Sequence, residues 1–315
     1  MKIFREPASS APSAVAVGVF DGLHRGHQRV LENLKEIASR HGVLSSVVTF
    51  DPHPAVALAP DRAPSQLGTI EQRLEGLEAL GIDQVRVLTF NAALAGETAE
   101  SFIARVLVDE MKATDVVVGE DFRFGHERQG NVSMLEKLSE SFGYRVHPAT
   151  IFGDGERWSS TSVRAALSKG NLDIANDVLG RPFVLRGTVV HGDARGAELG
   201  YPTANIYSHP RQQLPAIGIY AGATKTQAGE WMPAAISVGK RPQFYEDGQL
   251  LVEVHIPGFS GDLYDQVLDT AFISLLRGEM SFDGVDALIA QIDRDVAESV
   301  EIFKSFRPES SILLM

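Results

Sequence analysis

The stretch from Val15 to His27 constrains the fold of the first half of this chain more than any other segment. It begins with a short apolar run and turns at Asp21–Gly22. It then enters residues whose apolar positions repeat with a helical period. We therefore predict a strand, a turn and a helix. His24 and His27 fall at the helix start, where unpaired N–H groups and partial positive charge favour phosphate. The two imidazoles add donors that can stabilise developing negative charge.

Strands and helices alternate through the first half of the chain, which predicts a parallel sheet with crossover helices. After the apolar run at 14–20, the expected strands cover 44–50, 85–90 and 115–118. Ligands gather beyond the carboxyl ends of strands in such sheets. We therefore expect the polar residues that follow these strands to meet on one edge.

The loop from Gly119 to Gly125 places Arg123 between two aromatic residues and two glycines. One interpretation is a turn in which Phe122 and Phe124 are core residues. The interpretation we favour is a loop that packs on a planar ring and offers polar groups to a ligand, with Asp121 among them.

A run of hydroxyl residues, 159–162, precedes an apolar helix. Such residues are typical of helix N-caps, and capping alone would explain them. Hydroxyls at a helix start, followed by an arginine one turn later, also suit a phosphate clamp. The candidates for that clamp are Ser160, Thr161 and Arg164.

The second half changes to short runs rich in Val, Thr, Ile and Tyr, broken by Gly and Pro. The spacing predicts a small antiparallel β-barrel, and a long amphipathic helix from Val285 to Val300 closes the chain. We place the domain boundary between residues 182 and 183, giving domains 1–182 and 183–315. The six expected strands are 183–190, 201–206, 218–224, 231–238, 250–256 and 267–273.

Composition excludes several classes of function. The net charge of −12 disfavours a general nucleic-acid or anionic-membrane binder. The absence of cysteine excludes thiol nucleophiles, Cys-zinc sites and disulfides. No apolar stretch is long enough for a membrane span, so we expect a soluble cytoplasmic protein. The oligomeric state stays open.

The motif from Gly18 to His27 resembles the signature of the HxGH nucleotidyltransferases. Its Phe20-Asp21-Gly22 form is similar to the bacterial bifunctional riboflavin kinase/FMN adenylyltransferase family, also called FAD synthetases. The resemblance implies that His24 and His27 are catalytic, and that the Gly119–Gly125 loop is the family's second motif. It also implies that the Ser-Ser-Thr-x-Val-Arg segment holds the phosphates of ATP.

The second half resembles the same family over Gly192–Asn205, whose Pro-Thr-Ala-Asn core is typical of the riboflavin kinase nucleotide loop. The segment 252–255 resembles the one that carries the general base, which makes Glu253 the candidate base. A lone glutamate on the solvent face of a strand is the alternative. The oxygens of Thr203 and Asn205 suit a hard cation such as Mg²⁺. The resemblance further implies nucleotide or substrate binding by Gly192, Arg195, Thr203, Asn205 and Arg277.

Three positions depart from the family pattern: Ala197 stands for an arginine, Gln243 for a threonine and Asp265 for a glycine. They leave open an alternative in which only the adenylyltransferase is active and the barrel is a flavin-binding or regulatory module. A third hypothesis is a related HxGH transferase acting on another phosphorylated precursor. The Phe-Asp-Gly form and the barrel speak against it.

The two implied reactions need different sites. Phosphorylation of riboflavin starts from a neutral alcohol attacking the γ-phosphorus of ATP, so a carboxylate base is useful. Adenylation of FMN starts from an ionised phosphate attacking the α-phosphorus, so charge stabilisation is enough. We expect riboflavin, FMN, FAD and ATP as ligands and Mg²⁺ as the cofactor, with flavins as substrate and product.

Overall fold

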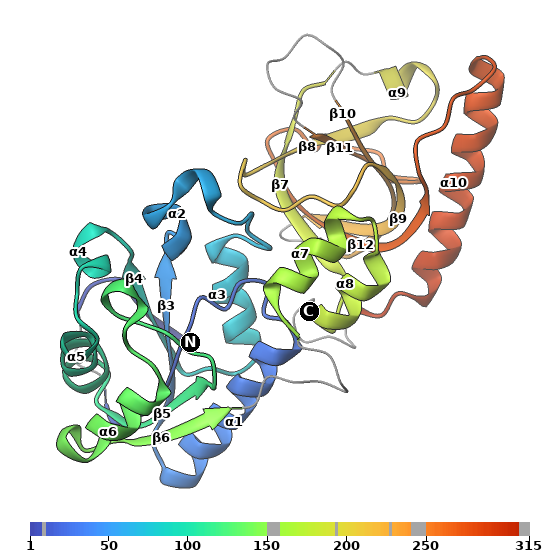
Figure 1. Ribbon diagram of the computed structural model, residues 1–315. Coiled ribbons are helices and arrows are strands. Elements are labelled where there is room, and N and C mark those ends of the chain that lie inside the picture. The colour runs from blue at the N-terminus through green and yellow to red at the C-terminus, as the bar shows by residue number, and fades with distance from the viewer. Residues whose placement is uncertain (8–10, 150–157, 193–194, 227–228, 241–249, 309–315) are drawn as a thin grey trace. The chain divides into compact units, whose positions relative to one another are not determined.

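The computed structural model describes residues 1–7, 11–149, 158–192, 195–226, 229–240 and 250–308, with Arg195 described in its backbone only. The chain divides into two compact units (Figure 1). The first comprises Met1–Pro64 and Ile70–Ser159. The second comprises Ser65–Thr69 and Ser160–Met315. Each unit is built around its own sheet.

The first unit contains a six-stranded sheet in the order β1-β4-β3-β2-β5-β6, and all neighbouring strands are parallel. From β2 the chain runs outward through β3 and β4, then crosses to β5 on the other side of β2. The order therefore reverses between β2 and β5, where ligands bind in sheets of this kind. The predicted α/β class is confirmed. The strands are β1 Lys2–Phe4, β2 Ser13–Val17, β3 Leu44–Asp51, β4 Gln84–Thr89, β5 Ala113–Gly119 and β6 Arg145–Ala149.

Helix α1 shows why the predicted strand–turn–helix forms. Its buried face holds the apolar residues of the helical repeat, and Gly42 ends it in a left-handed conformation. The segment after α5 continues as a π-helix, η2. The helical segments are α1 Arg25–His41, α2 Pro54–Leu58, η1 Pro60–Arg62, α3 Ile70–Ala79, α4 Ala92–Ala95, α5 Ala99–Phe102, η2 Ile103–Glu110, η3 His126–Arg128 and α6 Val132–Phe142.

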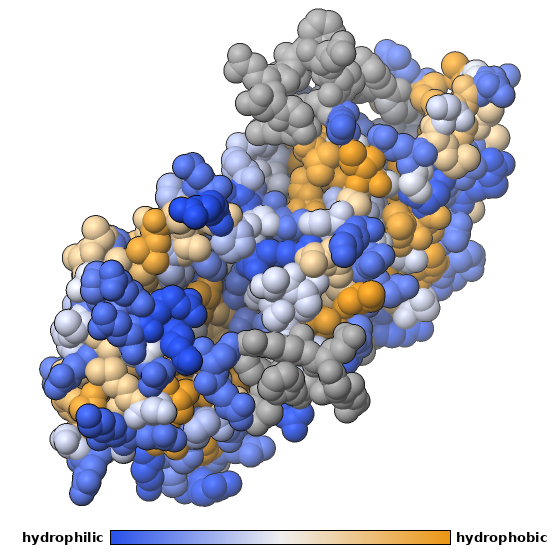
Figure 2. Space-filling model, viewed as in Figure 1, coloured by the Kyte–Doolittle hydropathy of each residue, from blue (hydrophilic) through white to orange (hydrophobic). Residues whose placement is uncertain are grey.

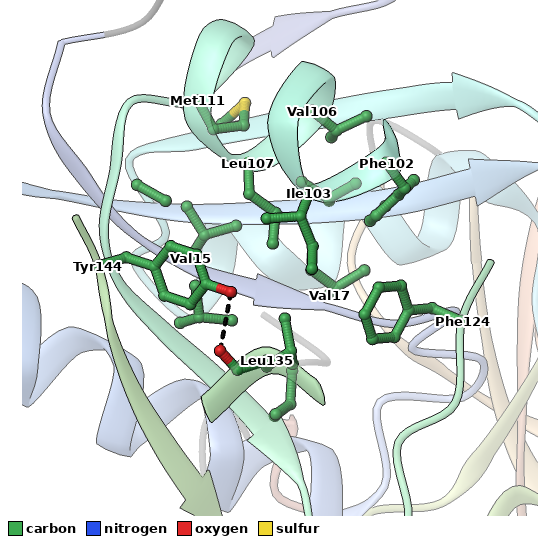
Figure 3. Packing of buried hydrophobic residues seen from close by; sticks show 14 of the residues in the cluster. Val15, Val17, Phe102, Ile103, Val106, Leu107, Met111, Phe124, Leu135 and Tyr144 are labelled. Atoms are coloured by element: carbon green, nitrogen blue, oxygen red, sulfur yellow. Dashed lines mark hydrogen bonds between the residues drawn. The ribbon is translucent and has the colours of Figure 1, made fainter. Parts of the chain in front are cut away.

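The core on one face of the sheet fixes strand β2 (Figure 3). Val15 and Val17 project into this core and pack with side chains of η2, while Ala14 and Ala16 face the opposite side, as strand alternation requires. The Tyr144 hydroxyl donates to the Leu135 carbonyl at 2.9 Å. Since both faces of β2 are covered, the turn that follows it leaves the sheet from a fixed point.

A buried carboxylate holds the opposite end of the sheet. Asp115 accepts hydrogen bonds from Arg145 Nε at 2.9 Å, His147 Nε2 at 2.8 Å and Thr114 Oγ1 at 2.9 Å, and its Oδ2 lies 3.0 Å from His41 Nδ1. Burial alone would raise the pKa of this carboxyl, but the hydrogen bonds hold it well below its usual range. The cluster joins β5, β6 and the end of α1.

The second unit is a closed antiparallel barrel of six strands in the order β10-β11-β8-β7-β12-β9. Helix α10 packs against β9, β10 and β12. The predicted barrel with a closing helix is confirmed. The elements are α7 Ser160–Ser168, α8 Leu172–Leu179, β7 Phe183–Val190, α9 Arg195–Glu198, β8 Thr203–Ser208, β9 Gly218–Thr226, β10 Met232–Lys240, β11 Leu250–His255, β12 Val267–Arg277 and α10 Val285–Ser305.

Helices α7 and α8 belong to the compact unit of the barrel. Asn176 of α8 donates from Nδ2 to the Phe272 carbonyl at 3.0 Å and accepts from the Phe183 N–H at 2.8 Å. These bonds hold α8 on strands β12 and β7. The functional boundary at residues 182 and 183 stays a prediction, and by packing alone the barrel unit begins its main segment at Ser160.

The face drawn in Figure 2 is mostly hydrophilic, in keeping with the net charge. On the barrel unit, hydrophobic side chains gather into several patches. Across the described ranges, no helix combines the length and the apolar character that a membrane crossing requires.

Candidate active sites

The turn between β2 and α1 is tightly wound. Phe20 and Leu23 have positive φ angles of 55° and 45°, and Gly22 lies at 80°. Left-handed backbone is uncommon for residues other than glycine and persists only where the surroundings enforce it. Here both non-glycine side chains are buried, so packing holds the turn in this conformation.

The predicted histidines are brought into contact by this turn. His24 is the N-cap of α1, and its Nδ1 accepts a hydrogen bond from the His27 N–H at 3.3 Å. The two rings stack with centroids 3.7 Å apart, and Phe20 meets His27 edge-on at 5.2 Å. Five residues of the predicted site, namely Phe20, Asp21, Gly22, His24 and His27, therefore occupy one corner at the carboxyl end of β2.

The electrostatics of this corner keep His27 neutral. Burial, followed by the charges of His24 and Arg73, lowers the pKa of His27 well below its ordinary value. The ring is half-buried, and its Nδ1 atom is enclosed without a hydrogen-bond partner among the described residues. A neutral imidazole beside a helix N-terminus can donate a hydrogen bond to an anion, and it avoids the free-energy cost of burying a charged ring.

The loop after β5 combines the two interpretations of its aromatic residues. Phe124 is buried in the core of the first unit, whereas Phe122 is half-buried and stacks on it at 5.3 Å. A methyl group on Gly125 would lie 2.6 Å from the Ala99 nitrogen, so the loop packs closely on α5. Asp121 and Arg123 are exposed. Ligand binding by Asp121, Phe122 and Arg123 stays a prediction.

The predicted phosphate clamp lies on α7, in the second unit. Ser160 is half-buried and begins the helix, and Thr161 is exposed. Arg164 donates from Nε to the Ser65 carbonyl. The clamp role of these three residues is untested and stays a prediction.

The barrel brings the predicted kinase residues together on one strand pair. Glu253 of β11 is directly opposite Asn205 of β8, and Thr203 is opposite His255. Because Val252 and Val254 are buried in the barrel, Glu253 lies on its outer face. Residues directly opposite each other have Cβ atoms about 5 Å apart. Glu253, Asn205 and Thr203 therefore share one small area of that face.

Gly192 lies close to Asn205. A Cβ at this position would lie 2.2 Å from the Asn205 Nδ2 atom, so any larger residue would force the Asn205 side chain to move. Residues 193–194 and the side chain of Arg195 lie outside the described part of the chain.

Arg277 has a structural partner that the sequence pattern does not reveal. Its Nη2 donates to Asp295 Oδ2 at 2.8 Å, and its guanidinium lies over the Phe282 ring at 5.6 Å. Gln291 Nε2 also donates to Asp295, at 2.7 Å. Asp295 is a carboxylate on the buried face of the amphipathic helix α10. That position is the sequence signal that could have identified it as the partner of a cation. The predicted substrate-binding role of Arg277 is untested.

The departures from the family pattern have local explanations where they are described. Asp265 adopts a φ of 61°, the left-handed conformation in which the family has glycine, and its N–H donates to the Val189 carbonyl at 3.0 Å. Ala197 lies in the short helix α9. Gln243 falls outside the described residues.

Oxygen donors suit the predicted magnesium site. The Thr203 hydroxyl and the Asn205 amide oxygen stand on neighbouring outward positions, with the Glu253 carboxylate opposite. Hard cations such as Mg²⁺ prefer such ligands together with phosphate and water. Within the described ranges, no group of three or more His, Asp or Glu side chains gathers as a metal site.

Comparison with protein families supports both halves. A family model for FAD synthetase matches residues 6–162, and one for riboflavin kinase matches residues 179–303. A bifunctional riboflavin kinase/FMN adenylyltransferase of Pseudomonas fluorescens is 39% identical, covering 89% of this chain and 90% of that protein. The protein of the same description from Escherichia coli strain K12 is 35% identical, covering 98% of this chain and 100% of its own length.

A solved structure has the same architecture. The crystal structure of a Streptococcus pneumoniae protein described as a macrolide-efflux protein is 29% identical, with a TM-score of 0.85. The match covers 98% of this chain and all of that chain. With relatives above 30% identity aligned over nearly its full length and a family model on each half, the chain belongs to the family of bifunctional riboflavin kinase/FMN adenylyltransferases.

Proposed function

We propose that this enzyme phosphorylates riboflavin to FMN with ATP and then adenylates FMN with a second ATP to FAD, releasing pyrophosphate. The observation that supports the proposal is that the predicted site residues form two separate clusters in one chain. One is the stacked pair His24 and His27 at the start of α1. The other is the cross-strand neighbours Glu253 and Asn205 on the barrel.

The first unit suits adenylyl transfer. The attacking FMN phosphate is already ionised, so the site must align two anions and stabilise the charge that grows on the leaving pyrophosphate. The N-terminus of α1 offers its N–H groups, and His27 offers a neutral ring as a donor. We assign Ser160, Thr161 and Arg164 to the phosphates of ATP, and Asp121, Phe122 and Arg123 to substrate contacts.

The barrel suits phosphorylation of an alcohol. Glu253 would take the proton from the ribityl hydroxyl as that oxygen attacks the γ-phosphorus and ADP leaves. Gly192, Arg195, Thr203 and Asn205 would hold the nucleotide. Mg²⁺ bound at Thr203 and Asn205 would neutralise phosphate charge. In this proposal Arg277, fixed by Asp295, borders the substrate site.

We assign the adenylyltransferase to residues 1–182 and the kinase to residues 183–315, and we place the enzyme in the cytoplasm, where ATP is available. The riboflavin kinase family model spans the barrel, which favours a catalytic barrel over a purely regulatory one.

The test is to incubate the pure protein with riboflavin, ATP and Mg²⁺ and to separate the flavins by chromatography. FMN and FAD are the expected products. FAD formed only from added FMN would mean that the barrel is not catalytic. The absence of any flavin product would overturn the proposal.

A further inference from the structure

Helix α3 carries one charged residue on the face that it buries. Its other buried residues are Leu74, Gly76 and Leu77, and Arg73 lies among them with 5% of its surface exposed. An arginine is almost never so fully buried unless specific groups hold it there. Neither of the two chemistries described above uses this residue, so its position requires a separate explanation.

The contacts of Arg73 lead to the catalytic turn. Its Nη1 donates to the Phe50 carbonyl at 3.0 Å and lies 3.3 Å from Thr49 Oγ1. The hydroxyl of Thr49 in turn donates to the carbonyl of Val19, at 3.1 Å. Arg73 thus connects α3 with the carboxyl end of β3 and with the residue that precedes Phe20.

The charge of Arg73 also acts on this corner. Burial lowers the pKa of its guanidinium, against the opposing effect of the carboxylates of Asp21, Asp51 and Glu71. The group nevertheless stays cationic, because an arginine pKa remains far above neutral pH. Its positive charge reaches His27 and opposes protonation of that ring, as does His24.

Two enclosed nitrogens at this corner lack hydrogen-bond partners among the described residues: Arg73 Nε and His27 Nδ1. Buried polar atoms are nearly always paired, and each exception in a native protein calls for an explanation, of which a catalytic role is one. His27 belongs to α1 and Arg73 to α3. The two unpaired nitrogens therefore come from separate helices that both pack near the turn.

We propose that Arg73 is a positioning residue of adenylyl transfer, which fixes the catalytic turn against the end of β3 and supplies a permanent positive charge that acts on His27. The inference rests on the proposed function of the first unit. Arg73 acts through Thr49, Phe50 and His27 and does not itself touch the substrate, because it is enclosed.

The test compares two variants. Arg73→Met removes the charge and keeps an aliphatic side chain, whereas Arg73→Lys keeps the charge and loses the guanidinium group with its several donors. Arg86→Met is the matched control. Arg86 of β4 is also buried, at 4% exposure, but it pairs with Glu110 of η2 and not with the turn. FAD formation from supplied FMN should fall about 10²-fold in Arg73→Met, as misplacement of a catalytic group can cause. The fall should appear in kcat, with riboflavin phosphorylation unchanged.

The decisive measurement is the pH midpoint of the His27 ring titration, followed by NMR from pH 8 down to the pH at which the ring protonates. The midpoint should be the same in the wild type, Arg73→Lys and Arg86→Met. In Arg73→Met the midpoint should move upward by about one pH unit, the effect of removing a nearby like charge. Arg73→Gln replaces Arg73→Met if the latter does not fold.

An unchanged His27 titration in the uncharged variants would overturn the proposal, as would an equal shift in Arg86→Met. This readout does not depend on catalysis. A wild-type protein that made no FAD would refute the proposed function, and the NMR result would still decide whether Arg73 governs His27.

Discussion

The proposed catalytic corner of the first unit and that of the barrel differ in the kind of group they offer. The first presents the stacked rings of His24 and His27 at a helix N-terminus, with His27 kept neutral and in edge-on contact with Phe20, on a turn that contains left-handed backbone. The second presents Glu253 on an outward-facing strand position, beside Asn205. This difference matches whether the attacking group in each proposed reaction must lose a proton. A hydroxyl must lose a proton to attack, whereas an ionised phosphate has none to lose.

The largest expected effect tests the barrel side of this comparison. Glu253→Gln preserves shape and removes basicity, so FMN formation should fall about 10²–10⁴-fold, the usual loss on removing a general base. Conversion of supplied FMN to FAD should be unchanged, and riboflavin binding should be little affected. Chromatography of the flavins and a binding titration would measure both.

Wild-type kinase turnover in Glu253→Gln would show that this residue is only a surface glutamate. Asp262, whose carboxylate accepts from the Tyr264 N–H at 2.9 Å, would then be the next base to test as Asp262→Asn.

The corresponding change in the first unit is His27→Ala. It should lower FAD formation by about 10²-fold, the loss expected for one charge-stabilising donor. FMN formation should stay near the wild-type rate, because the barrel does not use this ring. His126→Ala is a suitable control, since His126 is an exposed histidine in the same unit. A parallel fall of both activities would contradict the two-site model.

A smaller effect concerns how the two activities separate. We expect a fragment from residue 183 to fold and to phosphorylate riboflavin without making FAD. A fragment from residue 160 should be more stable by about 1–3 kcal/mol, because it retains α8 and the hydrogen bonds of Asn176 to Phe272 and Phe183. Urea unfolding of the two fragments measures the difference. Equal stability would show that α7 and α8 contribute nothing to the barrel.

The smallest expected effect concerns Asp265. Asp265→Gly should raise the free energy of unfolding by about 0.5–1 kcal/mol, since glycine adopts left-handed backbone without strain. Kinase activity should be unchanged. Asp265→Ala keeps the strain and should give no gain. A destabilised glycine variant would show that the aspartate side chain stabilises this turn by its own contacts.

The sequence predicts elements well where a periodic pattern coincides with burial. The face of α1 and strand β7 were read directly from their repeats. The pairing of Glu253 with Asn205 was not predicted, because it depends on the register of β11 against β8. Strands β1 and β6 and helix α6 were not predicted. β1 and β6 are sheet edges whose residues are only partly buried, so their hydrophobic pattern is weak.

Partners distant along the chain were also not predictable. A hydrophobic pattern assigns a charged residue such as Arg73 to the exposed face of its helix. Only the folded structure shows that its guanidinium donates to Thr49 and Phe50. The pairing of Gln66 with residues 211–213 is similar, because it attaches a short segment from before α3 to the barrel unit. Such contacts depend on topology and leave no local periodic signal.

The hydrogen bond that starts α1 has a consequence for the tautomer of His24. Its Nδ1 accepts from the His27 N–H, so the neutral ring must carry its proton on Nε2. A second proton could go only to Nδ1, and it would replace an acceptor by a donor pointing at another donor. Protonation of His24 and integrity of the helix start are therefore thermodynamically linked. Acid would weaken the first turn of α1 and the register of the two stacked rings together.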